Sequence, residues 1–371
     1  MDLTLDDDQR LLAESARQLF ERAYTTASAR DAEEQPEGFS ADLWRQTCEL
    51  GWPGIALPEG CGGAGYGTLE LAVLAEELGR GAATLPLLSS YAATLPVLWA
   101  GSDPLRRLWL TRLAAGEGIA ALALVEPGGG DERSAPTITA RAHDDHWVIS
   151  GTKIAVPFGA VAGVFVVSVA WPDGTTTVVA VDAATPGVTR ARHDTFAPVP
   201  YASVTFDDVV VTPDLVLGDS ATLERTLAHQ TVVDTAYAVG LCDAALALAV
   251  DHATNREQFG RPIGVNQAVS HQCVDMRVDI DAMRVLVHQA AWRLDRHDAN
   301  PAAAARAVAI ANAYARDVVP SVFARAHQVH GAMGFTMEYD LQLFSRRAKA
   351  YELTGGGAAW HLERVARSIG L

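Results

Sequence analysis

The hydrophobic periodicity of this chain changes twice along its length, and these changes constrain the fold most strongly. Residues 1–118 show helical spacing, as in DDDQRLLAESARQLFERA. On a helix this segment places five apolar side chains on one face: Leu11, Leu12, Ala16, Leu19 and Phe20. Residues 119–217 are Val/Thr-rich and alternate, in HWVISGTKIAV, VFVVSVAW, TTTVVAVDA and YASVTFDDVVV. Residues 218–371 are alanine-rich and helical again.

This order predicts a mainly α protein with a central β-domain. We expect an N-terminal α-helical domain (1–118), a small antiparallel β-barrel or sheet domain (119–217), and a C-terminal antiparallel four-helix-bundle domain (218–371). No long helical pattern separates the strands, which favours antiparallel pairing. The expected bundle helices cover 220–253, 265–297, 301–330, 336–351 and 358–369, and Asn300-Pro301 marks a helix start.

Composition excludes several classes of protein. The 371 residues are 49% hydrophobic, so the chain can bury a large core. Its net charge of −16 argues against binding to nucleic acid, whose phosphates require a basic surface. The acidic start, MDLTLDDDQR, does not resemble a secretory signal, and we expect a cytoplasmic protein. The uncharged run 81–102 contains Pro86 and Pro96, which favours a buried helical segment over a membrane span.

Six longer segments carry a family resemblance through their order and spacing. They read ELGWPGIALPEGCGGAGYG, AVLAEELGRGAATLP, IAALALVEPGGGDE, HWVISGTKIAVPFG, NREQFGRPIGVNQAVSHQCVDMRVDI and AHQVHGAMGFTMEYDLQLFSRRAKAYE. Together they resemble the acyl-CoA dehydrogenase family from end to end, and in particular the partner-type subunits of hetero-oligomeric bacterial acyl-CoA dehydrogenases. The resemblance implies FAD as cofactor, a dimer or dimer of dimers, and α,β-desaturation of an acyl-CoA thioester. It also implies electron-transfer flavoprotein as the electron acceptor.

The resemblance assigns one half of a cofactor site to the bundle. In this family one chain's β-domain holds the flavin ring, and the neighbouring chain's bundle holds the adenosine-diphosphate end. NREQFG supplies Arg256 for the pyrophosphate and Phe259 against the cofactor, while QVHGAMG supplies Gln328, Gly331 and Ala332. The family usually has a second glycine where this chain has Ala332. Two histidines three residues apart, His327 and His330, lack further ligands, so we expect interface histidines and no metal site.

The ring half of the site departs from the family pattern. Where the family has T-E-P and then G-S, this chain has Val125-Glu126-Pro127 and then Asp131 in place of the serine. Where the family has K-x-W-I-T, this chain has Lys153-Ile154-Ala155-Val156-Pro157. The first threonine hydroxyl, the tryptophan that covers the flavin and the second threonine are therefore all missing.

The family has two known positions for the catalytic base, and the first of them can be aligned with this chain in two ways. Glu352 matches the family's Y-E-G-T run superficially, as Y-E-L-T, but only with a three-residue insertion before the last helix. Counting back without gaps from WHLERVA places Gly355 at the base position. The family's other base location falls on Gln230, which cannot take a proton, and Asp234 one turn later is a weak substitute. Glu352 is the best single candidate in this chain.

Three hypotheses follow. The chain is a subunit of a hetero-oligomer whose sister chain supplies the base, or a self-sufficient homo-oligomeric dehydrogenase using Glu352, or a non-catalytic structural subunit. Hetero-oligomeric pairs occur in bacterial degradation of sterol side chains, where bulky substrates need an enlarged cleft. The retained bundle half and the eroded ring half favour the first hypothesis. The acyl group (fatty, branched or steroid) and its carrier (CoA or a carrier protein) stay open.

Overall fold

The computed structural model describes residues 4–130, 135–296 and 299–371. It divides into two compact units, each made of separate chain segments. The first, which we call the helical unit, comprises residues 1–31, 68–83 and 231–371. The second, which we call the sheet unit, comprises residues 32–67 and 84–230. The boundaries of the three domains expected from the sequence remain a prediction. The succession of a helical, a sheet and a helical domain is confirmed.

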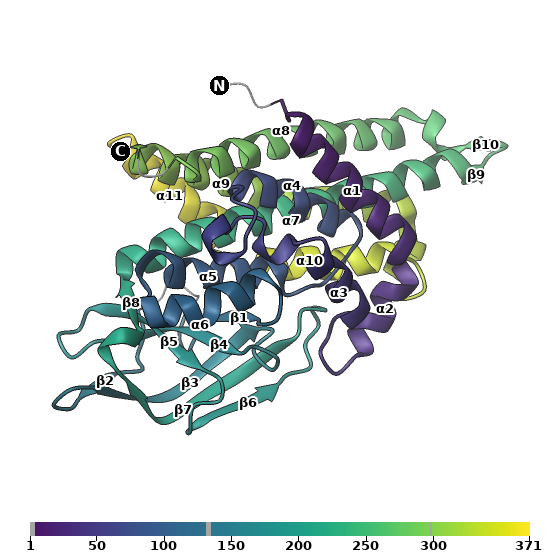
Figure 1. The fold of residues 1–371 in the computed structure, drawn as a ribbon. Helices are drawn as coiled ribbons and strands as arrows, with labels where there is room; N and C mark the ends of the chain where they lie inside the picture. The colour runs from purple at the N-terminus through teal and green to yellow at the C-terminus, as the bar shows by residue number, and fades with distance from the viewer. Residues whose placement is uncertain (1–3, 131–134, 297–298) are drawn as a thin grey trace. The chain divides into compact units, whose positions relative to one another are not determined.

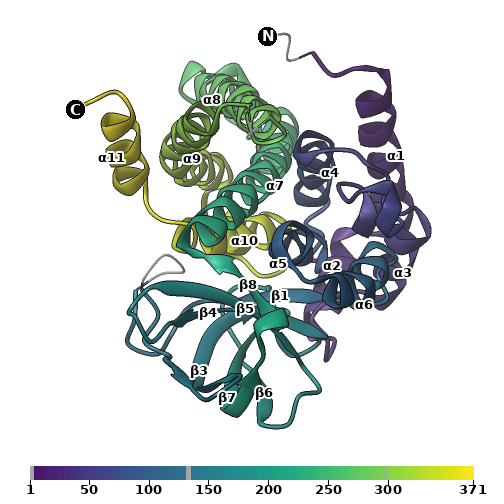
Figure 2. The same ribbon diagram turned by 60° about the vertical axis from the view of Figure 1, so that its left-hand side comes forward.

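The helical unit is built around long helices of the C-terminal segment. Its elements are α1 (Asp7–Ala23), α4 (Thr68–Arg80), α7 (Ser220–Asn255, from Thr231 onward), β9 (Glu257–Gln258), β10 (Arg261–Pro262), η4 (Ile263–Val265), α8 (Gln267–Leu294), α9 (Pro301–His330), η6 (Gly331–Phe335), α10 (Leu341–Leu353) and α11 (Ala358–Ser368). Helix α9 packs along α8, α10 and α11, and Figure 2 shows α7, α8 and α9 nearly end-on as a bundle. The short helix α2 (Thr26–Glu34) continues from this unit into the sheet unit.

Local signals set the helix starts. Helix α1 begins with a capping box, because the Asp6 carboxylate accepts from the backbone N–H of Gln9 and the Gln9 side chain accepts from the backbone N–H of Asp6. Asn300 caps α9 by accepting from the backbone N–H of Ala303 at 3.0 Å. The expected apolar face of α1 is correct at its C-terminal half but wrong at Leu11, which is 65% exposed.

Two glycines let α4 and α7 cross at close range. A Cβ added to Gly79 would overlap the carbonyl oxygen of Tyr237, and one added to Gly240 would overlap that of Glu76. Gly79 lies inside α4, so its role is helix packing, because the backbones meet where any side chain would intrude. Another difference concerns α10, which begins at Leu341 rather than at residue 336, since η6 and the turns after it precede the helix.

The sheet unit contains two four-stranded sheets. Their strands are β1 (Ala120–Ala123), β2 (Ala140–Ala142), β3 (Trp147–Pro157), β4 (Val164–Ala170), β5 (Thr176–Asp182), β6 (Val188–Arg192), β7 (Tyr201–Val211) and β8 (Val216–Asp219). One sheet has the order β1-β4-β5-β8 and the other β2-β3-β7-β6 (Figure 1). Pairing is antiparallel as expected, except that β1 and β4 are parallel, a pair that the alternation pattern does not reveal.

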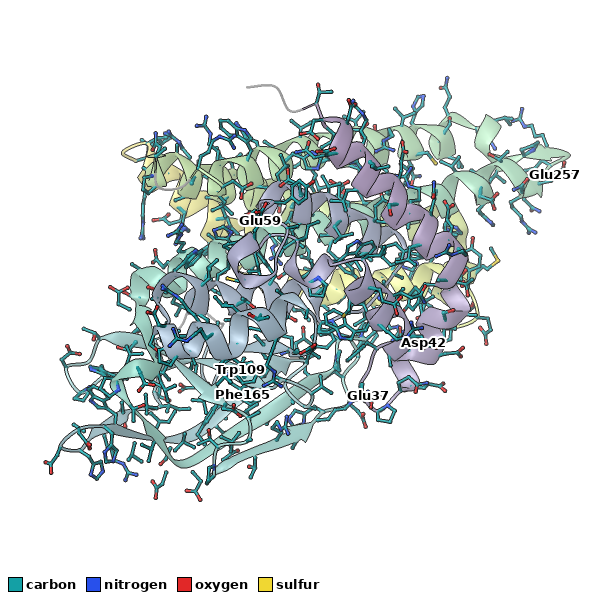
Figure 3. All side chains as sticks on the ribbon, in the orientation of Figure 1. Glu37, Asp42, Glu59, Trp109, Phe165 and Glu257 are labelled. Carbon is teal, nitrogen blue, oxygen red and sulfur yellow. The ribbon has the colours of Figure 1, made fainter. Side chains whose placement is uncertain are left out.

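Strands β4 and β5 are buried on both faces, and this explains their nearly continuous apolar sequence. One face meets the other sheet, where Phe165 packs edge-on against Phe206. The other face meets Trp109 of α6 and the apolar side of α5; Trp109 and Phe165 are labelled in Figure 3. The helices of this unit are α3 (Ala41–Glu49), η1 (Trp52–Gly54), η2 (Glu59–Cys61), α5 (Leu87–Ala100), α6 (Asp103–Ala114), η3 (Pro213–Leu215) and the start of α7.

Candidate functional site

A short hairpin at the end of α7 carries Arg256 and Phe259. Helix α7 ends at Asn255, and β9 and β10 then pair through a turn at Phe259 and Gly260, whose φ angles are 55° and 77°. Figure 3 shows Glu257 near the tip of this hairpin. A phenylalanine with positive φ is uncommon, and this one is 99% exposed. The hairpin therefore presents an aromatic side chain that the chain itself does not cover.

The end of α9 carries the second group of predicted cofactor residues. Gln328 is exposed in the last turn, and Gly331 caps the helix with φ 63° and ψ −144°, a conformation that strongly favours glycine. Ala332 follows, exposed, in η6. The next side chains include three partly or largely exposed apolar groups: Met333 (40%), Phe335 (71%) and Met337 (62%).

A stack of histidines joins these two segments. The rings of His252 on α7 and His330 on α9 lie with centroids 4.8 Å apart and planes at 27°. Arg256 follows His252 by one turn, its backbone N–H donating to the His252 carbonyl at 2.9 Å. The structure thus brings the two predicted nucleotide-binding segments together at one end of the helical unit. Arg256 itself is exposed and, within the described residues, forms no ion pair with a carboxylate.

The turn after α10 decides the geometry around Glu352. Glu352 lies in the last turn of α10 and pairs with Lys349 at 2.9 Å, while the three glycines follow as a loop. Gly355 is buried with φ 72°, and an added Cβ would overlap the Nη2 atom of Arg316. The Gly355 carbonyl accepts a hydrogen bond from buried His361 at 2.9 Å. At Gly355 the loop is therefore packed onto other side chains rather than open.

Arg316 is a buried cation at this loop. It is 6% exposed, its Nη1 donates to the Tyr351 carbonyl, and its guanidinium lies 3.8 Å from the Tyr351 ring centroid. The Tyr351 hydroxyl lies 3.0 Å from Thr235 Oγ1, which donates to Asn312 at 2.8 Å. Burial raises the pKa of Tyr351 and the Arg316 charge opposes that rise. The network thus joins the Arg316 guanidinium to the side chains of Tyr351, Thr235 and Asn312.

The two alternative base positions lie on α7. Gln230 and Asp234 are both partly buried there, one turn apart. The charge of Asp234 acts on Tyr351, so this carboxylate lies near the Arg316 network.

In the sheet unit, a buried ion pair holds the two segments that the family resemblance assigns to the flavin ring. Lys153 is fully buried on β3, and its ammonium donates to Glu126 Oε1 at 2.6 Å, to the Leu124 carbonyl at 3.1 Å and to Ser168 Oγ at 3.1 Å. Burial lowers the pKa of Lys153, opposed by Glu126. The Ile154 backbone N–H donates to the Val125 carbonyl at 2.8 Å.

A bulge in β3 follows this pair. The register between β3 and β7 shifts between Lys153 and Val156, and Ala155 is exposed with φ 51°. Ala155 stands where the resemblance places a tryptophan, and Pro157 has no N–H to donate. Asp131, the residue in place of the family serine, lies outside the described residues.

The donor set fits one part of a flavin dinucleotide and not the other. A free guanidinium, an exposed amide and a backbone that turns at Gly331 suit the diphosphate and nucleotide end. On the sheet unit, the Val125 side chain has no hydroxyl, Pro157 has no N–H, and the methyl group of Ala155 is too small to cover the flavin ring. Within the described residues, no group of three metal-ligating side chains forms.

Comparison with known proteins decides the family. Models of the acyl-CoA dehydrogenase N-terminal, middle and C-terminal domains match residues 6–117, 121–209 and 220–370. Benzylmalonyl-CoA dehydrogenase of Aromatoleum aromaticum is 31% identical over 98% of both chains. The chain belongs to the acyl-CoA dehydrogenase family. Members of this family are FAD-dependent oxidoreductases that act on CH–CH bonds.

Solved acyl-CoA dehydrogenases share the whole fold. A chain of the Tcur3481-Tcur3483 steroid ACAD superposes with a TM-score of 0.88 and 33% identity, covering 98% of both chains. A chain of the ChsE4-ChsE5 complex from Mycobacterium tuberculosis superposes with a TM-score of 0.91 and 27% identity, covering 100% of this chain and 99% of that one. Each of these two structures is named after a pair of different proteins.

Sequence reasoning missed three features of this acyl-CoA dehydrogenase site. Arg316 lies in an ordinary helical segment, and nothing local indicates that it meets Gly355. His252 precedes Arg256 by one turn, but its partner His330 is distant in sequence. The buried ion pair of Lys153 could have been predicted, because a lysine at an inward position of an alternating strand requires a buried partner.

Proposed function

We propose that this chain is a subunit of a hetero-oligomeric acyl-CoA dehydrogenase whose sister chain supplies the catalytic base. Its bundle holds the adenosine-diphosphate end of the sister chain's FAD. The reaction is α,β-desaturation of an acyl-CoA thioester, in which a base takes a proton from Cα. FAD, when bound, supplies the hydride acceptor for Cβ.

The observation that carries this proposal is the conformation of Gly355. On gapless counting Gly355 occupies the base position, and its positive φ costs a side-chain-bearing residue about 1–2 kcal/mol. A side chain there would also displace the Arg316 guanidinium, which the Tyr351 carbonyl and ring hold in place. The loop is therefore organised around a cation, and this supports loss of the base rather than its relocation.

The exposed end of the helical unit supports the partner role. Arg256, Gln328 and Gly331 face solvent next to the uncovered side chains of Phe259 and Phe335. A diphosphate and an apolar partner surface would together satisfy this combination of a free cation and bare aromatic groups. The resemblance to partner-type subunits supports the sister chain as that occupant.

The relatives support a bulky acyl group. The steroid ACAD chain has higher identity to this chain than several short-chain enzymes do, with 33% against 28% for the human short-chain enzyme. We therefore propose a steroid-type or similarly bulky acyl-CoA, with electrons passing to an electron-transfer flavoprotein.

The test is to purify the chain alone and together with the product of its neighbouring gene, and to record the visible spectrum, FAD stoichiometry and desaturase activity. We expect a chain without bound flavin when it is alone, and a yellow, active complex with the sister chain. A yellow homo-oligomer with one FAD per chain that desaturates acyl-CoA unaided would overturn the proposal. In that case loss of activity in Glu352→Gln would identify Glu352 as the base.

A further inference from the structure

The histidine stack at the nucleotide-binding end has an unusual hydrogen-bond balance. His330 is 6% exposed, and its Nδ1 donates to the Ala326 carbonyl at 2.7 Å. Because a carbonyl only accepts, the proton of the neutral ring is on Nδ1 and Nε2 is an acceptor. Within the described residues, Nε2 is buried and has no hydrogen-bond partner. A buried acceptor without a donor is costly, so a donor placed beside this ring would be stabilising.

The rings around this pair couple three segments of the chain. His330 contacts His252 on α7 and also Tyr339, at 5.0 Å between centroids. Next to it, His327 stacks on Phe335 at 4.3 Å and its Nε2 lies 2.7 Å from Ser345 Oγ. The ring contacts therefore link the end of α7, which carries Arg256, to the end of α9, which carries Gly331.

The charges around His252 are mostly positive. Burial, then the charges of His330 and Arg256, lower the pKa of His252, and Asp251 on the same helix opposes them. Burial and His330 lower the pKa of His327 in the same way. Asp340 acts, like Asp251, on the neighbouring Tyr339, and it pairs with Arg30 at 2.8 Å. The lowered pKa values favour the neutral imidazole at His252 and at His327, beside the permanent charge of Arg256.

Binding of a diphosphate would change the net charge near His252 from positive to negative. A diphosphate bound by Arg256 would offset the repulsion that this guanidinium exerts on a proton at His252, and its own negative charge would attract that proton. The phosphates are fully ionised across the physiological range, so the proton that is gained belongs to the protein. His252 is the group to receive it, since it lies one turn from Arg256 and is less deeply buried than His330.

We propose that the His252–His330 stack is a proton-coupled part of a nucleoside-diphosphate site, at which binding of the diphosphate places a proton on His252. The inference rests on the proposed function in one respect, namely that the ligand is the adenosine-diphosphate end of FAD held by Arg256. Affinity then rises as the pH falls, by at most about tenfold per pH unit for one proton. Above the pKa of the bound state the affinity is constant.

The experiment measures FAD binding to the deflavinated complex by titration calorimetry between pH 5.5 and 8. Buffers with different ionisation enthalpies report the number of protons taken up. We expect uptake approaching one proton per FAD at the acid end and none at the alkaline end. His252→Gln removes the uptake, and His252→Phe, which keeps a ring in the stack, removes it as well. His271→Gln, at an exposed histidine on α8, leaves the uptake unchanged.

The Arg256→Ala variant separates the nucleotide-holding role of the bundle from the proton uptake by His252. Weaker FAD binding at every pH in Arg256→Ala supports the nucleotide-holding role of the bundle. If Arg256→Ala binds FAD as tightly as the parent protein, that role fails and this inference fails with it. If Arg256→Ala weakens binding while His252→Phe still takes up the proton, only the role of His252 is overturned.

Discussion

At the residue scale, the buried lysine of β3 organises the part of the chain assigned to the flavin ring. The three N–H bonds of the Lys153 ammonium match its three acceptors, one each from Glu126, Leu124 and Ser168. Glu126 in turn accepts from the backbone N–H groups of Thr137 at 2.8 Å and Ile138 at 3.2 Å. Although burial raises it, these contacts hold the pKa of Glu126 below its usual value. The scaffold of the ring site thus persists where its flavin-facing side chains do not.

This pair predicts a strongly non-additive mutational response. Lys153→Met leaves the Glu126 carboxylate buried without its cation and should lower the free energy of unfolding by about 3–5 kcal/mol. The double variant Lys153→Met/Glu126→Leu removes both charges and should recover most of that loss. Urea unfolding of the single and double variants measures the coupling. Additive losses would mean that the two side chains do not act as a pair.

At the element scale, the crossing of α4 and α7 depends on the absence of two side chains. Glycine inside a helix ordinarily costs about 1 kcal/mol relative to alanine, so Gly→Ala usually stabilises. At Gly79 and Gly240 the facing carbonyl oxygens leave no room for a methyl group. The local preference and the tertiary contact therefore act in opposite directions at these positions.

We expect the tertiary contact to dominate. Gly240→Ala should lower the free energy of unfolding by about 1–3 kcal/mol or more, because the helices must separate to admit the Cβ. Gly357→Ala is the matched control, since its φ is −81° and an added Cβ meets no atom within 4 Å. Because Gly357 is the N-cap of α11, where alanine is less favourable than glycine, that control should lose only about 1 kcal/mol or less. Thermal unfolding of both variants gives the comparison, and a stabilised Gly240→Ala would contradict the close crossing.

At the scale of the whole molecule, histidines make stability depend on pH above the range in which carboxylates titrate. The pKa values of His252 and His327 lie below the unfolded value of about 6.5, so the unfolded chain binds protons more readily. Their contribution is present above pH 6.5 and is lost as the pH falls through that value toward the folded pKa. Each can change the free energy of unfolding by at most about 1.4 kcal/mol per pH unit.

The purified protein without FAD should therefore lose stability between about pH 6.5 and 5. Urea midpoints at intervals across this range give the slope. The double variant His252→Phe/His327→Gln should flatten it, while His271→Gln should not. An unchanged slope in the double variant would assign the pH dependence to other groups.

Local sequence patterns were enough to predict the helices whose starts and apolar faces depend on residues close together in the chain. The bounds of α9 and the Asn300 cap depend on residues within a turn or two, and apolar periodicity places α7 and α8 for the same reason. The order of helices, strands and helices, together with the spaced motifs, was enough to assign the acyl-CoA dehydrogenase family.

Only the tertiary structure decided which distant residues meet. From the sequence alone Gly355 is a flexible loop residue, but in the structure Arg316 packs against it. In the same way, nothing near His252 in the sequence indicates that the ring of His330 stacks on it. The grouping of α5 and α6 with the strands, and of α4 with the C-terminal helices, is equally invisible in local periodicity. Periodicity shows which face of an element is buried, because that pattern repeats along the chain. It does not show what that face is buried against, because the partner is chosen by packing and charge across the folded chain.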